Sequence, residues 1–132
     1  NMETKAVLDS DILIEFLRNK PQAIQLIKSL KERYELYTTD INSFELFYGA
    51  YRSKKTDKNI DGIKILLNSL QIIGTNSESA ETSGKLMAEL QSKGQMIEIE
   101  DILIGGICLA NSCAIATNNK AHFQRMGIKI LD

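Results

Sequence analysis

Short apolar runs of strand length alternate with helical patterns along the chain, and this order limits the folds that it can adopt. The runs fall at residues 5–8, 35–38, 71–74, 114–116 and 128–131. Helical spacing predicts helices at residues 12–19, 21–30, 41–52, 57–70, 77–93, 99–111 and 120–125. Apolar strands joined by helices form a parallel sheet that is covered by helices on both faces. We therefore expect an α/β fold, a three-layer α/β/α sandwich with a short parallel sheet.

The length of 132 residues suits one folded domain, which we expect to span residues 2–132. Asn1 precedes Met2 and is interpreted as a residue left by cloning. The only cysteines, Cys108 and Cys113, lie in one apolar stretch and are expected to be buried thiols. No apolar run approaches the roughly 20 residues that span a bilayer, and no signal peptide is recognised. We therefore expect a cytoplasmic protein.

Acidic side chains follow the first apolar run. Asp9 comes directly after residues 5–8, which places it at the carboxyl end of a strand, where sheets of this class form ligand sites. Asp11 adds a second acid to the same edge. A structural role also fits, because Asp9 or Ser10 can cap the following helix and Asp11 can interact favourably with its dipole.

Glu45 lies on what looks like the apolar face of a predicted helix. It shares a stripe with Ile41, Phe44 and Tyr48. Burying an unpaired carboxylate costs several kcal/mol, so a core-facing Glu45 needs a basic partner or a cation. Alternatively, the helix is rotated so that Glu45 reaches solvent at the edge of the stripe.

Asp101 heads a second face of apolar and small residues, which continues through Gly105. The mid-helix glycines Gly105 and Gly106 each cost about 1 kcal/mol relative to alanine. Such a cost indicates close backbone packing, which we expect to be against the sheet beneath the site. Asp101 is also explained as a first-turn acid that stabilises the helix dipole.

A further polar cluster, Thr117, Asn118 and Asn119, follows the apolar run 114–116. Turn chemistry alone also explains this cluster. Acids at strand ends and on helix faces that pack there are expected to converge, and converging carboxylates raise one another's pKa values. Mg²⁺ or Mn²⁺ relieves that repulsion because both prefer oxygen ligands. The pattern therefore predicts a cation site and metal-assisted attack on a phosphoryl or similar group.

Four segments in this order resemble the motifs of PIN-domain nucleases. They are LDSDILI at residues 8–14, FELFYGA at 44–50, DILIGG at 101–106 with Gly94 and Ile97 before it, and ATNNKAHF at 116–123. Together with the length and the final short strand, they resemble the VapC-type toxins of bacterial and archaeal toxin–antitoxin modules. The resemblance covers nearly the whole chain.

This resemblance implies a Mg²⁺- or Mn²⁺-dependent endoribonuclease that cuts single-stranded or loop RNA and leaves 5′-phosphate and 3′-hydroxyl ends. Asp9, Glu45 and Asp101 match the family's acidic metal ligands, and Glu45 either binds the ion or orients the attacking water. Asn119 falls at the fourth catalytic position, which is often Asp in the family, and Asn118 takes that place if the register shifts by one. Residues expected to line the substrate site are Ser10, Asp11, Thr117 and Asn118.

The family resemblance also implies a homodimer and a cognate antitoxin whose extended or helical tail occupies the active-site groove. The formal net charge is −1, so no overall basic balance attracts RNA, and local patches or metal must supply positive charge. His122, the only histidine, is interpreted as a stacking or packing residue. Basic residues near the site motifs are candidate RNA contacts, although ordinary solvated helix ends would show the same pattern. They are Arg18, Lys20, Arg52, Lys54, Lys55, Lys58 and Lys120.

Two other functions stay open at this point. Asp9 and Asp11 after a strand also resemble the nucleophile-and-acid pair of haloacid-dehalogenase-like phosphatases. That group needs a later acidic pair, and residues 116–119 contain none. Alternatively, the chain keeps a PIN-like fold as a non-catalytic binding protein, a reading that only Asn119 at the fourth position favours.

Overall fold

A computed structural model describes residues 4–132, so Asn1, our suspected cloning remnant, lies outside the described residues. The expected single domain over residues 2–132 stays a prediction. Within the described part, helices and strands alternate as expected. The elements are β1 (Lys5–Leu8), α1 (Ser10–Leu17), α2 (Pro21–Lys31), β2 (Glu35–Thr39), α3 (Asp40–Tyr51), α4 (Thr56–Asn68), β3 (Gln71–Ile73), α5 (Ser77–Ser92), α6 (Ile99–Ala110), β4 (Cys113–Ala116) and α7 (Lys120–Arg125).

The four strands form one parallel sheet in the order β3-β2-β1-β4. β1 is central and pairs with β2 on one side and β4 on the other, with Leu8 opposite Ala116 at the carboxyl end. The chain builds β1, β2 and β3 outward in one direction and then returns to place β4 on the opposite side of β1. The junction of β1 and β4 is therefore the topological switch point of the sheet, where ligand sites form in folds of this class.

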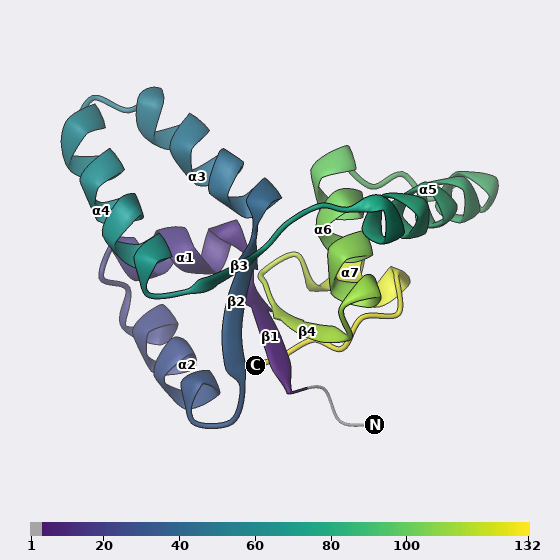
Figure 1. The fold of residues 1–132 in the computed structure, drawn as a ribbon, viewed down its shortest axis with the longest axis horizontal. Helices are drawn as coiled ribbons and strands as arrows, with labels where there is room; N and C mark the ends of the chain where they lie inside the picture. The colour runs from purple at the N-terminus through teal and green to yellow at the C-terminus, as the bar shows by residue number, and fades with distance from the viewer. Residues whose placement is uncertain (1–3) are drawn as a thin grey trace.

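Alternating side chains on β1 divide the core into two layers. Ala6 and Leu8 pack with α1 to α4, whereas Val7 packs with α5 to α7. Figure 1 shows α1 to α4 on one side of the sheet and α5 to α7 on the other. The expected three-layer α/β/α sandwich is confirmed. β1 and β4 are buried apart from the partly exposed Lys5, whereas the outer strand β3 is largely exposed, so the burial predicted for the strands is most complete at the pair that forms the switch point.

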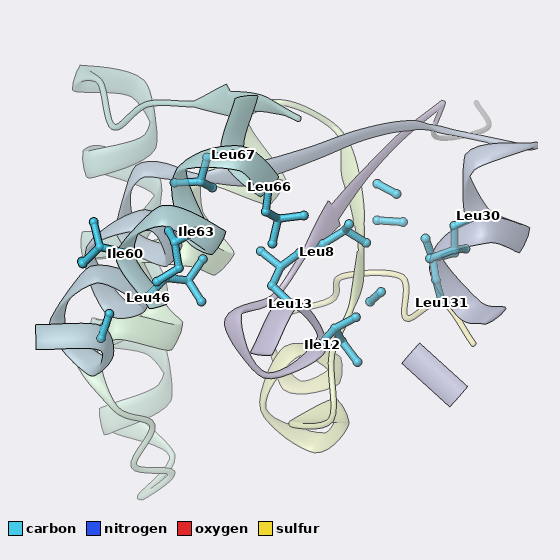
Figure 2. Close-up of a cluster of buried hydrophobic side chains, with 14 residues drawn as sticks. Leu8, Ile12, Leu13, Leu30, Leu46, Ile60, Ile63, Leu66, Leu67 and Leu131 are labelled. Atoms are coloured by element: carbon cyan, nitrogen blue, oxygen red, sulfur yellow. The ribbon is translucent and has the colours of Figure 1, made fainter. Parts of the chain in front are cut away.

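The larger core cluster lies between the sheet and α1 to α4. Figure 2 shows it extending from Leu46 and Ile60 at one end to Leu30 and Leu131 at the other. Complete burial of one such leucine stabilises the fold by about 1.5–3 kcal/mol. On the other face, Phe123 of α7 is fully buried, so both helical layers are firmly attached to the sheet.

Helix boundaries follow local sequence signals. Thr39 begins α3 with a capping box, in which its hydroxyl accepts from the backbone N–H of Asn42 and the Asn42 side chain accepts from the backbone N–H of Thr39. Gly94 has a φ of 69° just after α5, as expected for a glycine that ends a helix. Cys108 and Cys113 are buried free thiols, which confirms their predicted role. None of the helices formed by residues 4–132 is long and apolar enough to cross a membrane.

The predicted strand at residues 128–131 was wrong. Ile130 forms only an isolated parallel bridge to Ile115 of β4. The backbone N–H of Ile128 donates instead to the carbonyl of Phe123 in α7, so this residue belongs to the turn that ends the helix. Within residues 4–132, backbone hydrogen bonding of this segment to β4 is limited to the Ile115 N–H, which donates to the Lys129 carbonyl at 3.0 Å, and the Leu131 N–H, which donates to the Ile115 carbonyl at 2.8 Å.

The close packing predicted at the glycines of α6 is present, but its partner is different. A Cβ on Gly105 would lie 2.2 Å from Sδ of Met126, and one on Gly106 would lie 1.9 Å from Oγ of Ser83. The two glycines therefore let α6 approach α5 and the end of α7, rather than the sheet.

Candidate active site

Asp9 lies at the switch point between β1 and β4. It follows β1 directly, and its backbone N–H donates to the carbonyl of Ala116, 3.0 Å away at the end of β4. Its carboxylate, only 4% exposed, accepts hydrogen bonds from the Ser10 backbone at 2.8 Å, Asn42 Nδ2 at 3.0 Å and Thr117 Oγ1 at 2.6 Å. Asp9 therefore both caps α1 and directs a carboxylate to the edge where two strands end.

The pKa of Asp9 is raised mainly by burial, and the negative charge of Asp101 raises it further. The hydrogen bonds from Thr117, Ser10 and Asn42 act in the opposite direction, because they stabilise the ionised form. The carboxylate of Asp9 is thus buried and hydrogen-bonded, and it lies close enough to Asp101 for that charge to raise its pKa.

Glu45 reaches the same edge from α3, but not on the stripe that we predicted. Phe44 and Tyr48 are exposed and stack on one another with ring centroids 6.1 Å apart. The face of α3 that enters the core carries Asn42, Leu46 and Ala50 instead. Glu45 is therefore half-buried at the border of that face. This position agrees with the alternative in which the helix is rotated and Glu45 lies at the edge of the buried stripe.

A hydrogen-bond chain joins Glu45 to Asp9. Ser10 Oγ donates to Oε1 of Glu45 at 2.7 Å and accepts from Nδ2 of Asn42 at 2.9 Å, and the same Nδ2 lies 3.0 Å from Asp9. Burial raises the pKa of Glu45, and the charges of Asp9, Asp101 and Glu100 add to the effect. The side chain of Glu45 is thus held by Ser10 and coupled to both other predicted acids.

Asn42 is a site residue that sequence analysis missed. It is fully buried, and its side chain contacts Thr39, Ser10 and Asp9. The available signal was its position three residues after the helix cap Thr39, which favours a capping box and an inward-facing side chain.

Asp101, in the first turn of α6, contributes the third acid. It is 9% exposed, and its Oδ2 lies 2.8 Å from Nδ1 of His122 on α7. We had interpreted His122 as a stacking or packing residue. The structure instead places it in direct polar contact with one of the predicted metal ligands.

The loop after β4 joins the site through Thr117 rather than through its asparagine side chains. The Asn119 backbone N–H donates to Thr117 Oγ1 at 3.0 Å, and within residues 4–132 the Asn119 side chain makes no hydrogen bond to an acid of the site. The Asn118 backbone N–H donates to Oδ2 of Asp11 at 3.0 Å, and its side chain donates to Glu15 at 3.3 Å. The catalytic role predicted for Asn119 stays a prediction.

Asp11 lies at the border of the site. Burial, followed by the charge of Asp9, raises the pKa of Asp11 to about 6. Its two oxygens accept from the backbone N–H groups of Ile12 and Asn118, so it ties the start of α1 to the loop after β4.

The acids fit a divalent cation in donor type and in charge. The charge of Asp101 raises the pKa values of both Asp9 and Glu45. Within the described residues, no lysine or arginine forms a salt bridge with any of these three acids. In that same range, 4–132, no three side chains of acidic, histidine or cysteine type meet closely enough to enclose an ion alone. Mg²⁺ retains several waters and needs only one or two carboxylates, so this looser arrangement suits it.

A cavity of about 300 Å³ adjoins Glu45 between α1, α3 and α4. Its walls are mainly apolar, with Leu17, Leu46 and Ile63 among them, and the basic residues Arg18 and Lys58 also line it. Of the predicted RNA contacts, these two therefore lie beside the acidic site. Elsewhere, Lys120 pairs with Asp132, and Arg52 stacks over the ring of Tyr48.

A family model of the PIN domain matches residues 6–129. The chain belongs to the PIN-domain family. Among its relatives is the tRNA(fMet)-specific endonuclease VapC of Salmonella typhimurium, 30% identical over 97% of each chain. Ribonuclease VapC2 of Rickettsia felis is 29% identical over 96% of this chain and 95% of the relative. This membership overturns the phosphatase alternative based on Asp9 and Asp11.

Solved structures share the fold of this PIN domain. The DNA-bound VapBC of Salmonella typhimurium superimposes with a TM-score of 0.87 at 28% identity, covering 99% of this chain and 98% of the other. VapBC2 of Rickettsia felis, bound to a promoter DNA fragment, gives a TM-score of 0.88 at 24% identity over 96% of both chains. The neighbours are toxin–antitoxin complexes.

Proposed function

We propose that this PIN domain is a Mg²⁺- or Mn²⁺-dependent endoribonuclease and the toxin of a VapBC-type toxin–antitoxin pair. The observation that carries the proposal is the electrostatic coupling of Asp9, Glu45 and Asp101 at the switch point of the sheet. The ribonuclease names of relatives that match nearly the whole chain support it further. The Salmonella relative's name makes initiator transfer RNA the first substrate to test.

Asp9 and Asp101 would hold the ion, because they are the most buried acids of the site, one at the end of β1 and the other in the first turn of α6. When bound, such an ion supplies polarisation of the scissile phosphate and a lowered pKa for an attacking water. Glu45 is suited to orient that water and accept its proton, since a raised pKa brings a carboxylate closer to the working pH of a general base. Cleavage of the bond between phosphorus and the 3′ oxygen then leaves 5′-phosphate and 3′-hydroxyl ends.

Ser10, Asn42 and Thr117 support these acids rather than react. Their hydrogen bonds fix the carboxylates of Glu45 and Asp9 before substrate arrives, which lowers the cost of organising the site during the reaction.

The cavity beside Glu45 suits a peptide segment with apolar side chains and at least one acidic group for Arg18 or Lys58. We propose that the tail of a cognate antitoxin occupies it and thereby blocks the site. The VapBC assemblies among the structural neighbours support a partner of this kind. A homodimer and a cytoplasmic location belong to the same proposal.

The test is cleavage of end-labelled transfer RNA and of an unstructured RNA oligomer by the purified protein, with Mg²⁺, with Mn²⁺ and with excess EDTA. We expect cleavage with either ion and none with EDTA. Asp9→Asn and Asp101→Asn should each reduce the rate by more than about 100-fold, since even indirect partners of a metal contribute up to that much. Asp61→Asn, the same change at an exposed position of α4, is the matched control and should cleave like the wild type.

Equal cleavage by the wild type and both acid variants would mean that a contaminating nuclease is responsible, and the proposal would be lost. Metal binding without any cleavage would instead support the non-catalytic binding protein that Asn119 favours. Thermal stabilisation by Mn²⁺ separates these outcomes, because a ligand that binds only the folded state raises the melting temperature.

A further inference from the structure

His122 lies against the carboxylate of Asp101. Nδ1 of its ring is 2.8 Å from Oδ2 of Asp101, and the two side chains are 33% and 12% exposed. His122 is the only histidine in the chain and belongs to α7, which follows the loop after β4. The contact therefore links the last helix to the first turn of α6.

Two pairs of residues, each one helical turn apart, bring α6 and α7 into this register. Asp101 and Gly105 share one face of α6, and His122 and Met126 share one face at α7 and its cap. Since a Cβ on Gly105 would lie 2.2 Å from Sδ of Met126, the glycine is what lets Met126 pack against α6. Asp101 and His122 lie one turn before Gly105 and Met126, so the close packing of the two helices also places the His122 ring beside Asp101.

Buried apolar side chains dock α7 against the rest of the molecule. Phe123 is fully buried and Met126 is 6% exposed, and both belong to the apolar cluster on this face of the sheet. His122 is by comparison a partly exposed residue at the edge of the contact. Its polar contact with Asp101 lies at the rim of this apolar packing.

The contact engages only one of the two carboxylate oxygens. An ionised carboxylate is only an acceptor, so with Asp101 in that form the hydrogen bond runs from Nδ1–H of His122 to Oδ2. Within residues 4–132, Oδ1 of Asp101 receives no hydrogen bond, whereas both oxygens of Asp9 are engaged. Asp101 is therefore held through one oxygen and has the other available.

We infer that His122 is a positioning residue, which holds Asp101 through Oδ2 so that Oδ1 is presented to a divalent cation. The inference rests on the proposed function and deepens it. In metal sites, side chains that orient a ligand through a hydrogen bond contribute substantially to metal affinity. In this chain that role falls to His122, one residue before the buried Phe123, and not to the side chains of Asn118 or Asn119.

The test measures Mn²⁺ affinity by calorimetric titration at one fixed pH, on the whole chain without RNA. His122→Ala should weaken Mn²⁺ binding by about 10- to 100-fold, the range for losing such a partner. His122→Asn should recover most of the affinity, because the asparagine amide nitrogen can donate from nearly the same place as Nδ1. In RNA cleavage, His122→Ala should lower kcat with little change in KM.

Asn111→Ala is the matched control. It removes a side-chain hydrogen bond of 2.8 Å to the Ile107 carbonyl at the opposite end of α6, far from Asp101 in the helix. This variant should bind Mn²⁺ like the wild type even if its melting temperature falls.

The inference is overturned if His122→Ala changes the melting temperature but not the Mn²⁺ affinity, since the contact is then only structural. It is also overturned if His122→Ala binds Mn²⁺ more tightly, because the imidazole would then compete with the ion. If His122→Ala does not fold, the His122→Asn variant decides alone: affinity near that of the wild type supports the inference, and a loss like that of Asp101→Asn overturns it. A wild-type protein that binds no Mn²⁺ overturns the proposed function together with this inference.

Discussion

Thr117 and Asp9 lie 108 residues apart in the sequence, yet the hydroxyl of Thr117 donates a hydrogen bond of 2.6 Å to Oδ2 of Asp9. Each residue is the first after one of two neighbouring strands, β4 and β1, which run parallel with Leu8 opposite Ala116. The pairing of the strands is what brings the two side chains together. The acidic edge is thus a direct product of the sheet topology.

Thr117→Val tests this contact, because valine keeps the shape and removes the hydroxyl, which donates to Asp9 and also accepts from the Asn119 backbone N–H. We expect the free energy of unfolding to fall by about 1.5–3 kcal/mol, as for a hydrogen bond to a charged group. The bond also holds the pKa of Asp9 down, so the acidic limb of the pH–rate profile should move to higher pH. Urea unfolding and rate measurements across pH check both. Thr82→Val, whose exposed hydroxyl bonds only the Glu78 carbonyl, should change neither.

Ser10→Ala tests the chain of bonds that holds Glu45. The change removes the donor at 2.7 Å from Oε1, and Asn42 keeps its bond to Asp9. We expect RNA cleavage at neutral pH to slow by about 10-fold or more, comparable to losing a partner that orients a metal-site ligand. Ser92→Ala, which loses a hydroxyl bonded to Glu89 on the surface of α5, is the control. Equal rates for Ser10→Ala and the wild type would show that Glu45 does not need this support.

The raised pKa of Asp11 predicts that the stability of the protein depends on pH in the absence of divalent ions. Its pKa in the folded protein is about 6, raised from 3.8, so the folded state keeps a proton that the unfolded chain has already released. The stability from this group is present below its unfolded pKa and is lost as the pH rises through the folded value. The raised pKa values of Asp9 and Glu45 act in the same direction.

The measurement is urea unfolding at about pH 5 and about pH 7.5 with EDTA present. The wild type should lose stability between these two conditions through this group, and Asp11→Asn should lose less. Asp61→Asn, at an exposed site, should behave like the wild type. If Asp11→Asn loses as much stability between the two pH values as the wild type does, the raised pKa of Asp11 is not the cause.

The packing of α6 on α5 predicts opposite effects for two glycine substitutions. In Gly106→Ala the new Cβ would lie 1.9 Å from Ser83 Oγ and 2.8 Å from the backbone oxygen of Ser79, so the helices must separate. We expect destabilisation by about 1–3 kcal/mol, as for other overpacked cores. Gly84→Ala, on α5 with open space around it, should stabilise the protein by up to about 1 kcal/mol. Thermal or urea unfolding of the pair is the test.

The fold and most of the acidic site were predictable because their signals are local. The apolar run before Asp9 and the one before Thr117 identify buried strands, and parallel strands end at the same edge of a sheet. The face of α3 was harder to predict. Its buried stripe begins with the polar Asn42, so the more apolar stripe of Phe44 and Tyr48 looked like the core side, although both rings are exposed.

The contact of His122 with Asp101 depends on tertiary packing that sequence spacing does not encode. The two residues are 21 positions apart on different helices, and the packing of Met126 against Gly105 helps to set their register. The strand expected at residues 128–131 is reduced to a single bridge for a similar reason, because the N–H of Ile128 donates to Phe123 in the turn that ends α7 and only residues 129–131 reach β4.

The most direct test of a cation among the acids is anomalous X-ray diffraction from crystals grown or soaked with Mn²⁺. We predict a Mn²⁺ peak within direct ligand distance, about 2.0–2.2 Å, of carboxylate oxygens from both Asp9 and Asp101. This peak should be absent from crystals of Asp101→Asn. Mn²⁺ bound elsewhere, or no peak here at a concentration that supports RNA cleavage, would contradict the account.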